Sequence, residues 1–197
     1  MPPLQLRFVT SAAEVGTLPA GQVEVAFIGR SNVGKSSLIN ALANQKQLAK
    51  VSKTPGRTQL INLFTLADGT TVVDLPGYGY ANAPKAVRSA WGPMIERYLL
   101  ERDELARILV LVDGEIGPTK LDVSMLDWLR HHHLPFAVVA TKHDKVKSSA
   151  RQKRRRELAE KCGVPEQAVT WVSAAKGVNI DLLRDKIYRW LHPEEQP

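Results

Sequence analysis

Residues 29–36 read GRSNVGKS and match the pattern G-x-x-x-x-G-K-S, which cradles phosphate groups in backbone amides. Glycine is needed at positions 29 and 34 because the chain must turn sharply and bring its N–H groups to the phosphates. Lys35 supplies positive charge for the outer phosphates, and Ser36 supplies a hydroxyl for Mg²⁺. An apolar run precedes this segment and a helical pattern follows it, which disfavours a chance match to an ordinary glycine turn. The segment predicts a nucleoside triphosphate site and leaves the base undetermined.

A second motif indicates which base is bound. Residues 141–144 read TKHD, fit the pattern [N/T]-K-x-D, and follow a buried apolar run. The Asp144 carboxylate can accept hydrogen bonds from N1–H and the exocyclic amine of guanine, a donor pair that adenine lacks. The aliphatic stem of Lys142 can cover the base, and the small residues of the later segment 173–176, SAAK, would let the backbone approach it. Alone, the TKHD segment is equally compatible with a polar turn in which Asp144 caps a helix.

A third motif, residues 74–77 with the sequence DLPG, matches D-x-x-G after another apolar run. Asp74 would hold Mg²⁺ through a water molecule, and the amide of Gly77 would contact the γ-phosphate. A threonine should also reach Mg²⁺ from the segment that precedes the second strand. The candidates there are Ser52, Thr54 and Thr58. Spacing alone does not decide among the three, but Thr58 lies closest to the strand, which favours it.

The elements that must position these motifs alternate along the chain. Six apolar runs predict buried strands at Val23–Ile28, Leu60–Leu66, Thr71–Leu75, Ile108–Val112, Phe136–Thr141 and Ala168–Val172. Helical patterns separate most of them, whereas the tight turn over residues 67–70 makes the second and third runs an antiparallel hairpin. We therefore expect an α/β fold of three layers, α/β/α, around a six-stranded, mostly parallel sheet with one antiparallel edge hairpin. We expect an N-terminal extension over residues 1–20, one domain over 21–192 and a tail over 193–197.

Length and composition agree with one globular domain. The chain has 197 residues, of which 44% are hydrophobic and 24% are charged, and its apolar runs are too short to cross a bilayer. No secretory signal follows Met1, and the single cysteine, Cys162, fits a reducing cytoplasm. The formal net charge is +7, and most of it lies in residues 145–161, which contain eight basic and two acidic residues.

This basic segment predicts a contact with nucleic acid. Arg151, Arg154 and Arg155 have no acidic residue four positions later, so an external phosphate is the expected partner for each of them. The alternative is a solvated helix whose charges neutralise one another. Two i,i+4 pairs, Lys153 with Glu157 and Arg156 with Glu160, would support that alternative.

Together, the motifs resemble the translation-factor-related, Ras-like P-loop GTPases, and more narrowly the EngB (YihA/YsxC) family of ribosome-biogenesis GTP-binding proteins. Two segments carry the narrower resemblance: residues 53–59, KTPGRTQ, and residues 74–81, DLPGYGYA. The similarity extends over nearly the whole chain, from about Leu6 to Leu191. It implies a Ras-like fold with an EngB-type GTPase domain over residues 21–192, and hydrolysis of GTP to GDP and phosphate.

The resemblance also implies a role for individual residues. Lys35, Thr58 and Gly77 would act in catalysis, and Mg²⁺ would bind Ser36, Thr58 and, through water, Asp74. Contacts with GTP or GDP are expected from Gly29, Arg30, Ser31, Asn32, Val33, Gly34, Lys35, Ser36, Ser37, Gly56, Arg57, Thr58, Gln59, Leu60, Asp74, Leu75, Pro76, Gly77, Thr141, Lys142, His143, Asp144, Val172, Ser173 and Ala174. His143 stands where the family usually has a small residue.

Two residues bear on the rate of hydrolysis. In Ras-like enzymes a glutamine directly after D-x-x-G orients the attacking water, but this chain has Tyr78 there, so we expect slow intrinsic hydrolysis that a partner stimulates. Relatives with asparagine at the position of Asn32 can bind K⁺, which adds positive charge near the developing negative charge. The alternative is that Asn32 only braces the phosphate loop.

The resemblance implies a GTP-dependent switch in assembly of the large (50S) ribosomal subunit, with ribosomal RNA and ribosomal proteins as partners, and a requirement in cell division and septation. We expect a cytoplasmic monomer that contacts neither membrane nor DNA. One alternative is a small GTPase that acts on a protein effector without direct ribosome contact, although no C-terminal lipidation box supports membrane-anchored signalling. A metabolic enzyme such as a kinase is disfavoured by the guanine motif and by the lack of a substrate domain.

Overall fold

A computed structural model describes residues 1–49, 60–79 and 92–193. Its strands form one sheet in the order β1-β3-β4-β2-β5-β6-β7. The strands are β1 (Arg7–Ala12), β2 (Glu24–Gly29), β3 (Ile61–Thr65), β4 (Thr71–Asp74), β5 (Leu105–Asp113), β6 (Phe136–Thr141) and β7 (Thr170–Trp171). Strands β4, β2, β5, β6 and β7 pair in parallel, and β3 pairs antiparallel with β4, as the hairpin pattern predicts.

The expected strand number is wrong by one, because β1 extends the sheet beyond the hairpin. β1 pairs antiparallel with β3, and the register shifts between Phe8 and Thr10. Of its six residues only Ala12 is buried, while Phe8 is 53% exposed. An edge strand that buries so little lacks the apolar run by which the other strands are recognised. The sheet therefore has seven strands instead of six.

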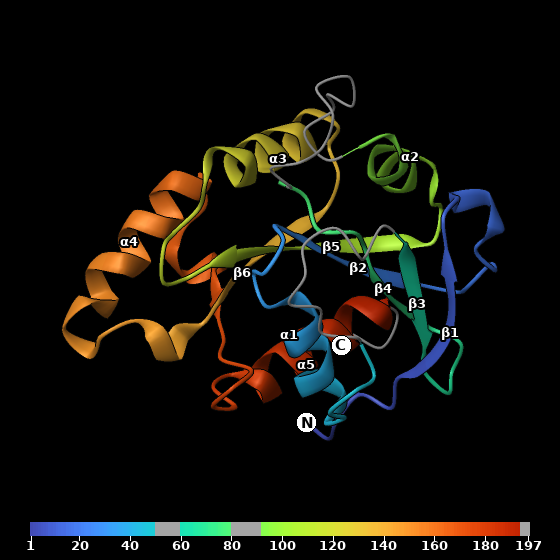
Figure 1. Cartoon of the computed structure of the whole chain (residues 1–197), viewed down its shortest axis with the longest axis horizontal. Coiled ribbons are helices and arrows are strands. Elements are labelled where there is room, and N and C mark those ends of the chain that lie inside the picture. The colour runs from blue at the N-terminus through green and yellow to red at the C-terminus, as the bar shows by residue number, and fades with distance from the viewer. Residues whose placement is uncertain (50–59, 80–91, 194–197) are drawn as a thin grey trace.

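Helices cover both faces of the sheet (Figure 1). The helices are α1 (Lys35–Ala43), α2 (Pro93–Glu101), α3 (Lys120–His131), α4 (Arg151–Cys162) and α5 (Ile180–Leu191), with short 3₁₀ turns η1 (Val15–Thr17), η2 (His143–Lys145), η3 (Ser148–Ala150) and η4 (Glu166–Ala168). On one face, α1 and α5 pack through residues such as Leu38 and Ile187. On the other, α2, α3 and α4 bury Ile95, Met125 and Leu158. The predicted three layers, α/β/α, are confirmed.

The parallel strands bring the motifs to one edge of the sheet. The phosphate loop follows β2, Asp74 is the last residue of β4, and the TKHD segment begins at the end of β6. Residues at the carboxyl ends of parallel strands lie at the same edge, which is where α/β proteins of this type bind their ligands. No helix in residues 1–49, 60–79 and 92–193 is long and apolar enough to cross a membrane.

Candidate nucleotide site

The phosphate loop requires its two glycines for different reasons. Gly34 has φ +102°, a backbone conformation that residues with a side chain rarely adopt. A Cβ atom on Gly29 would lie 2.9 Å from the carbonyl oxygen of Leu111 and 3.0 Å from Cγ1 of Val33. The loop is therefore packed so closely onto β5 that only glycine fits at its start.

Lys35 and Asp74 meet at the centre of the site. The Lys35 ammonium forms an ion pair and hydrogen bond with Oδ1 of Asp74, and the two side chains are 9% and 2% exposed. The Lys35 ammonium balances the charge of the buried Asp74 carboxylate. The carboxylate therefore stays in the interior as an acceptor that a phosphate-bound metal ion could use. Within the described residues, no three His, Cys, Asp or Glu side chains gather as a metal cage. Mg²⁺ in phosphate sites needs none, because substrate phosphates and water complete its coordination.

The D-x-x-G segment lies directly against the phosphate loop. The amide of Tyr78 donates to the carbonyl of Gly29 at 3.2 Å, and the amide of Ser31 donates to the carbonyl of Tyr78 at 3.0 Å. A Cβ atom on Gly77 would lie 3.1–3.2 Å from atoms of Ser31. The structure thus brings the predicted γ-phosphate contact at Gly77 next to the loop.

The TKHD segment joins the same site through Thr141. The Thr141 hydroxyl donates to the carbonyl of Val33 at 2.7 Å, so the expected base-binding motif is tied to the phosphate loop. The Ser173 hydroxyl donates to Oδ1 of Asp144 at 2.6 Å. This hydrogen bond lowers the pKa of Asp144, despite some desolvation, so the carboxylate stays ionised and can accept from a base. The structure therefore brings together Thr141, Asp144 and Ser173, as the motif order predicts.

Sequence reasoning missed Asp113 at the end of β5. Its carboxylate is 4% exposed, pairs with the Lys142 ammonium at 2.6 Å, and accepts from the amide of Glu115 at 2.9 Å. It holds the stem of Lys142, whose backbone has φ 56°, in one place beside the base motif. The signal was present, because Asp113 is an acidic residue at the carboxyl end of a buried apolar run.

His143 is 8% exposed, and within the described chain its Nδ1 has no hydrogen-bond partner. Its ring contacts Trp171 edge-to-face, with centroids 6.1 Å apart. Burial lowers the pKa of His143, and the positive charges of Arg151 and Arg155 lower it further. A neutral, buried imidazole packs as part of the core behind the base motif.

The remaining predicted contacts divide into three groups. Arg30, Asn32, Ser36, Ser37, Leu75, Pro76, Val172 and Ala174 lie on the loops and helix end around the same edge of the sheet. Leu60 is 40% exposed just before β3. Gly56, Arg57, Thr58 and Gln59 lie outside the described residues, so the expected Mg²⁺ ligand Thr58 has no structural account.

Comparison with known proteins decides the family. A family model described as 50S ribosome-binding GTPase matches residues 24–142. The probable GTP-binding protein EngB of Vibrio vulnificus (strain YJ016) is 45% identical over 190 residues, which cover 94% of this chain and 88% of that protein. The chain belongs to the EngB family.

Solved structures agree. The crystal structure of a probable GTP-binding protein EngB matches with a TM-score of 0.70 at 28% identity, covering 87% of this chain and 100% of that one. Era in complex with MgGDPNP and nucleotides 1506–1542 of 16S ribosomal RNA matches with a TM-score of 0.66 at 27% identity, covering 91% of this chain and 59% of Era. This EngB-family protein is thus a Ras-like P-loop GTPase that binds GTP and GDP.

In this EngB-family chain the side chain of Tyr78, which replaces the usual glutamine, is turned toward α3. It is 2% exposed, and its hydroxyl donates to Oδ1 of Asp122 at 2.7 Å beneath α3. Burial and the Asp122 charge raise the pKa of Tyr78 well above its usual value, so the hydroxyl remains a donor. The Tyr78 side chain is thus fixed against α3 by a buried carboxylate.

The basic segment of this EngB-family chain runs from the end of η2 through η3 into α4, which lies at the periphery of the molecule (Figure 1). Five of its eight cationic side chains are exposed: Lys145, Lys147, Lys153, Arg156 and Lys161. The carboxylate oxygens of Glu157 lie 3.8 Å from Nζ of Lys153 and 3.8 Å from Nη1 of Arg154. The Arg156–Glu160 ion pair that helical spacing allows is absent among the described residues. The Nε of Arg151 donates to the carbonyl of Val146 at 3.2 Å. Charge on α4 is thus only partly neutralised from within.

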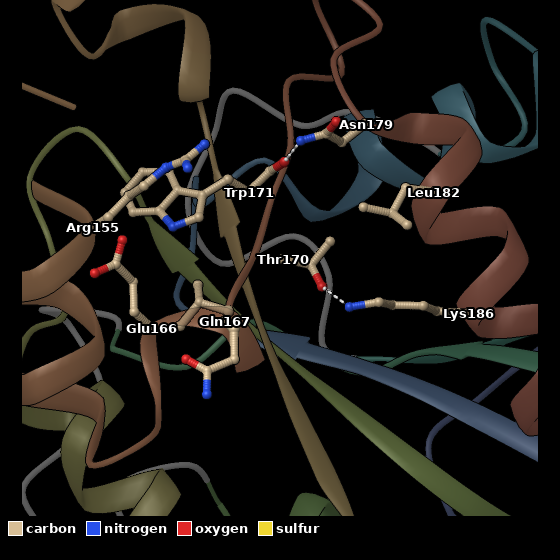
Figure 2. A pocket seen from close by; sticks show the side chains of 9 residues that line it. Arg155, Glu166, Gln167, Thr170, Trp171, Asn179, Leu182 and Lys186 are labelled. Carbon is tan, nitrogen blue, oxygen red and sulfur yellow. Dashed lines mark hydrogen bonds between the residues drawn. The ribbon is translucent and has the colours of Figure 1, made fainter. Parts of the chain in front are cut away.

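A pocket of about 430 Å³ lies beside this helix, between α4, η4, β7 and α5 (Figure 2). Arg155 and Lys186 bring positive charge to its wall and Glu166 brings a negative charge, while Lys186 donates to the Thr170 hydroxyl at 2.8 Å. The Nε atoms of Arg155 and Trp171 are buried without acceptors in the described part of the chain. None of the lining residues belongs to the nucleotide site.

Proposed function

We propose that this GTPase is a switch in assembly of the 50S ribosomal subunit, which it contacts through ribosomal RNA and ribosomal proteins when GTP is bound. The observation that carries the proposal is the exposed, incompletely neutralised charge on α4 and its flanks. The first turn of α4 contains basic residues and no acidic one, which opposes the helix dipole and lowers helix stability. An external polyanion removes that cost, and RNA is a polyanion.

Similar proteins support the same partner. The matching family model is described as a 50S ribosome-binding GTPase, which supports the large subunit as the partner. The Era complex contains 16S ribosomal RNA, which supports a contact with ribosomal RNA but not the choice of the large subunit. We propose the half-buried Arg151, Arg154 and Arg155 as phosphate contacts on α4, together with the exposed cations Lys153 and Arg156 beside them. Arg155 also lines the pocket of Figure 2, so a phosphate there would reach α4 and α5 together. The surface of α4 and this pocket then form one RNA-binding face.

Removing three cations from α4 tests this face. We expect the triple variant Lys153→Ala/Arg154→Ala/Arg156→Ala to bind purified 50S subunits at least about tenfold more weakly. The slope of log K against log salt should also become shallower by about 2, because each lost phosphate contact reduces that slope by about 0.7–0.9. Filter binding between about 50 and 200 mM salt measures both. Lys46→Ala/Lys120→Ala, which removes exposed cations elsewhere, is the control. An unchanged slope in the triple variant would refute the assignment of α4.

We propose that Mg²⁺ is held by Ser36, by Thr58 and, through water, by Asp74, where it would neutralise the charge of the phosphates. The buried Asp74 carboxylate supports this assignment, because its partner Lys35 would turn to the phosphates when nucleotide binds. Lys35 then contacts the outer phosphates and Gly77 the γ-phosphate. Because Tyr78 is held by Asp122, intrinsic hydrolysis is slow until a partner, which we propose is the large subunit, supplies the missing group.

We also propose that K⁺ assists hydrolysis beside Asn32. This residue is exposed on the phosphate loop and has φ 63°, so its side chain is accessible to a cation from solvent. A monovalent cation there would offset charge that develops on the transferred phosphoryl group. We expect turnover to be about tenfold faster in K⁺ than in Na⁺ buffer, and the difference to disappear in Asn32→Ala. Equal turnover of the unchanged protein in both buffers would remove K⁺ from the mechanism.

Depletion of the protein from cells tests the role in assembly. With the gene under a repressible promoter, sucrose gradients should show large-subunit precursors accumulating before growth slows, and septation should fail afterwards. Restoring Lys153→Ala/Arg154→Ala/Arg156→Ala should not clear the precursors, whereas the control variant Lys46→Ala/Lys120→Ala should. Normal subunit profiles in depleted cells with defective septa would instead place the function in division.

A further inference from the structure

The Tyr78–Asp122 hydrogen bond connects the nucleotide site to helix α3. Tyr78 follows D-x-x-G directly, and Asp122 lies 1% exposed in the first turn of α3. The Asp122 carboxylate uses both oxygens: Oδ1 accepts from Tyr78 at 2.7 Å, and Oδ2 accepts from the amide and the hydroxyl of Thr119, each at 2.7 Å. Asp122 is therefore fixed by the capping box of α3 before it holds the tyrosine.

The backbone around Tyr78 is held by the phosphate loop at the same time. Its carbonyl accepts from the amide of Ser31 at 3.0 Å, and its amide donates to Gly29 at 3.2 Å. Beyond it, Gly79 has φ +82°, and a Cβ there would lie 3.2 Å from Cγ of Arg30 and from Cδ1 of Leu121. The segment 77–79 therefore packs between the phosphate loop and α3.

We infer that Tyr78 and Asp122 are positioning residues that hold the Gly77 amide at the γ-phosphate position and thereby set the preference for GTP over GDP. GDP has no γ-phosphate, so loss of the Tyr78–Asp122 hydrogen bond should weaken the binding of the triphosphate alone. This inference rests on the GTPase activity and is independent of the ribosome, since nucleotide binding by the isolated protein tests it. The Tyr78 side chain faces α3, so it would act on the nucleotide through the Tyr78 backbone.

The competing explanation is that the hydrogen bond only stabilises the core. The chain supplies a matched comparison in Tyr98, which is fully buried on α2 and donates to Oε1 of Glu24. Glu24 begins β2, at the edge of the sheet opposite to the phosphate loop. Both tyrosines thus join a helix to the sheet through a buried carboxylate, but only Tyr78 lies beside the nucleotide.

The test compares Tyr78→Phe with Tyr98→Phe, each of which removes one hydroxyl and keeps the ring. We expect Tyr78→Phe to bind a non-hydrolysable GTP analogue about tenfold more weakly, as loss of one buried hydrogen bond to a carboxylate implies, and GDP within about twofold of the unchanged protein. Its kcat for GTP hydrolysis should fall similarly. Tyr98→Phe should lower the thermal midpoint and leave the ratio of the two affinities unchanged. Fluorescence titration with both nucleotides measures the ratio.

Two further variants separate the cap from the anchor. Thr119→Ala removes the hydroxyl that caps α3 but keeps the Thr119 amide on Oδ2 of Asp122, so Asp122 stays in place for Tyr78. This variant should lower stability without changing the affinity ratio. Asp122→Asn keeps an oxygen for Tyr78 but weakens the acceptor, so it should change the ratio in the same direction as Tyr78→Phe. If Tyr78→Phe and Asp122→Asn keep the affinity ratio of the unchanged protein, or if Tyr98→Phe shifts it equally, the inference is wrong.

Discussion

Asparagine in place of Asp144 should weaken GTP binding by about a thousandfold. The Ser173 hydroxyl donates to the Asp144 carboxylate at 2.6 Å and keeps it ionised by lowering its pKa, and we expect this carboxylate to accept two hydrogen bonds from guanine. Asparagine replaces one acceptor oxygen with a donor and removes the charge, and each charge-assisted hydrogen bond contributes about 1.5–3 kcal/mol. The loss therefore corresponds to about 4 kcal/mol. Isothermal titration with GDP and GTP measures it.

The same variant should gain affinity for xanthine nucleotides, because the xanthine ring presents a carbonyl where guanine has its exocyclic amine. Asp127→Asn, which changes an exposed carboxylate on α3, is the matched control and should leave guanine binding unchanged. A fall in GDP and XDP affinity together would mean that Asp144 supports the loop without reading the base.

Methionine in place of Lys35 should abolish GTP hydrolysis and also destabilise the nucleotide-free protein by about 3 kcal/mol. Lys35 and Asp74 are both buried, so loss of the ammonium leaves an unpaired carboxylate in the interior. Without the ammonium, the outer phosphates also lose their point charge. Urea denaturation and phosphate release measure the two effects separately.

A double variant distinguishes these roles of Lys35. Asp74→Asn removes the carboxylate charge, so Lys35→Met/Asp74→Asn should recover most of the lost stability and remain inactive. If Lys35→Met unfolds at the same urea concentration as the unchanged protein, the buried ion pair does not contribute to stability as the structure implies.

Local patterns in the sequence correctly predict the strands that bring the candidate site residues together. The phosphate loop, Asp74 and the TKHD segment each follow a buried strand, and the parallel sheet brings them to one edge. Strand β1 could not be predicted in this way, because its exposed residues carry no alternation and its place depends on pairing with β3, about fifty residues later.

Partners that are distant in sequence were also beyond prediction. Tyr78 and Asp122 are 44 residues apart, and their contact depends on how α3 packs on the sheet.

On α4, spacing correctly predicts the Lys153–Glu157 pair but not Arg154–Glu157, which competes for the same carboxylate. The rotation of α4 is fixed by its buried residues Leu158, Ala159 and Cys162, and this rotation decides which cations face solvent.

Co-sedimentation with purified ribosomal subunits tests the central claim most directly. The protein is loaded with GDP or with a non-hydrolysable GTP analogue and centrifuged with 30S or 50S subunits at physiological salt. We predict retention on 50S subunits with the analogue, release with GDP, and no retention on 30S subunits. No binding to either subunit in either nucleotide state would contradict the proposal and would direct the search to a protein effector.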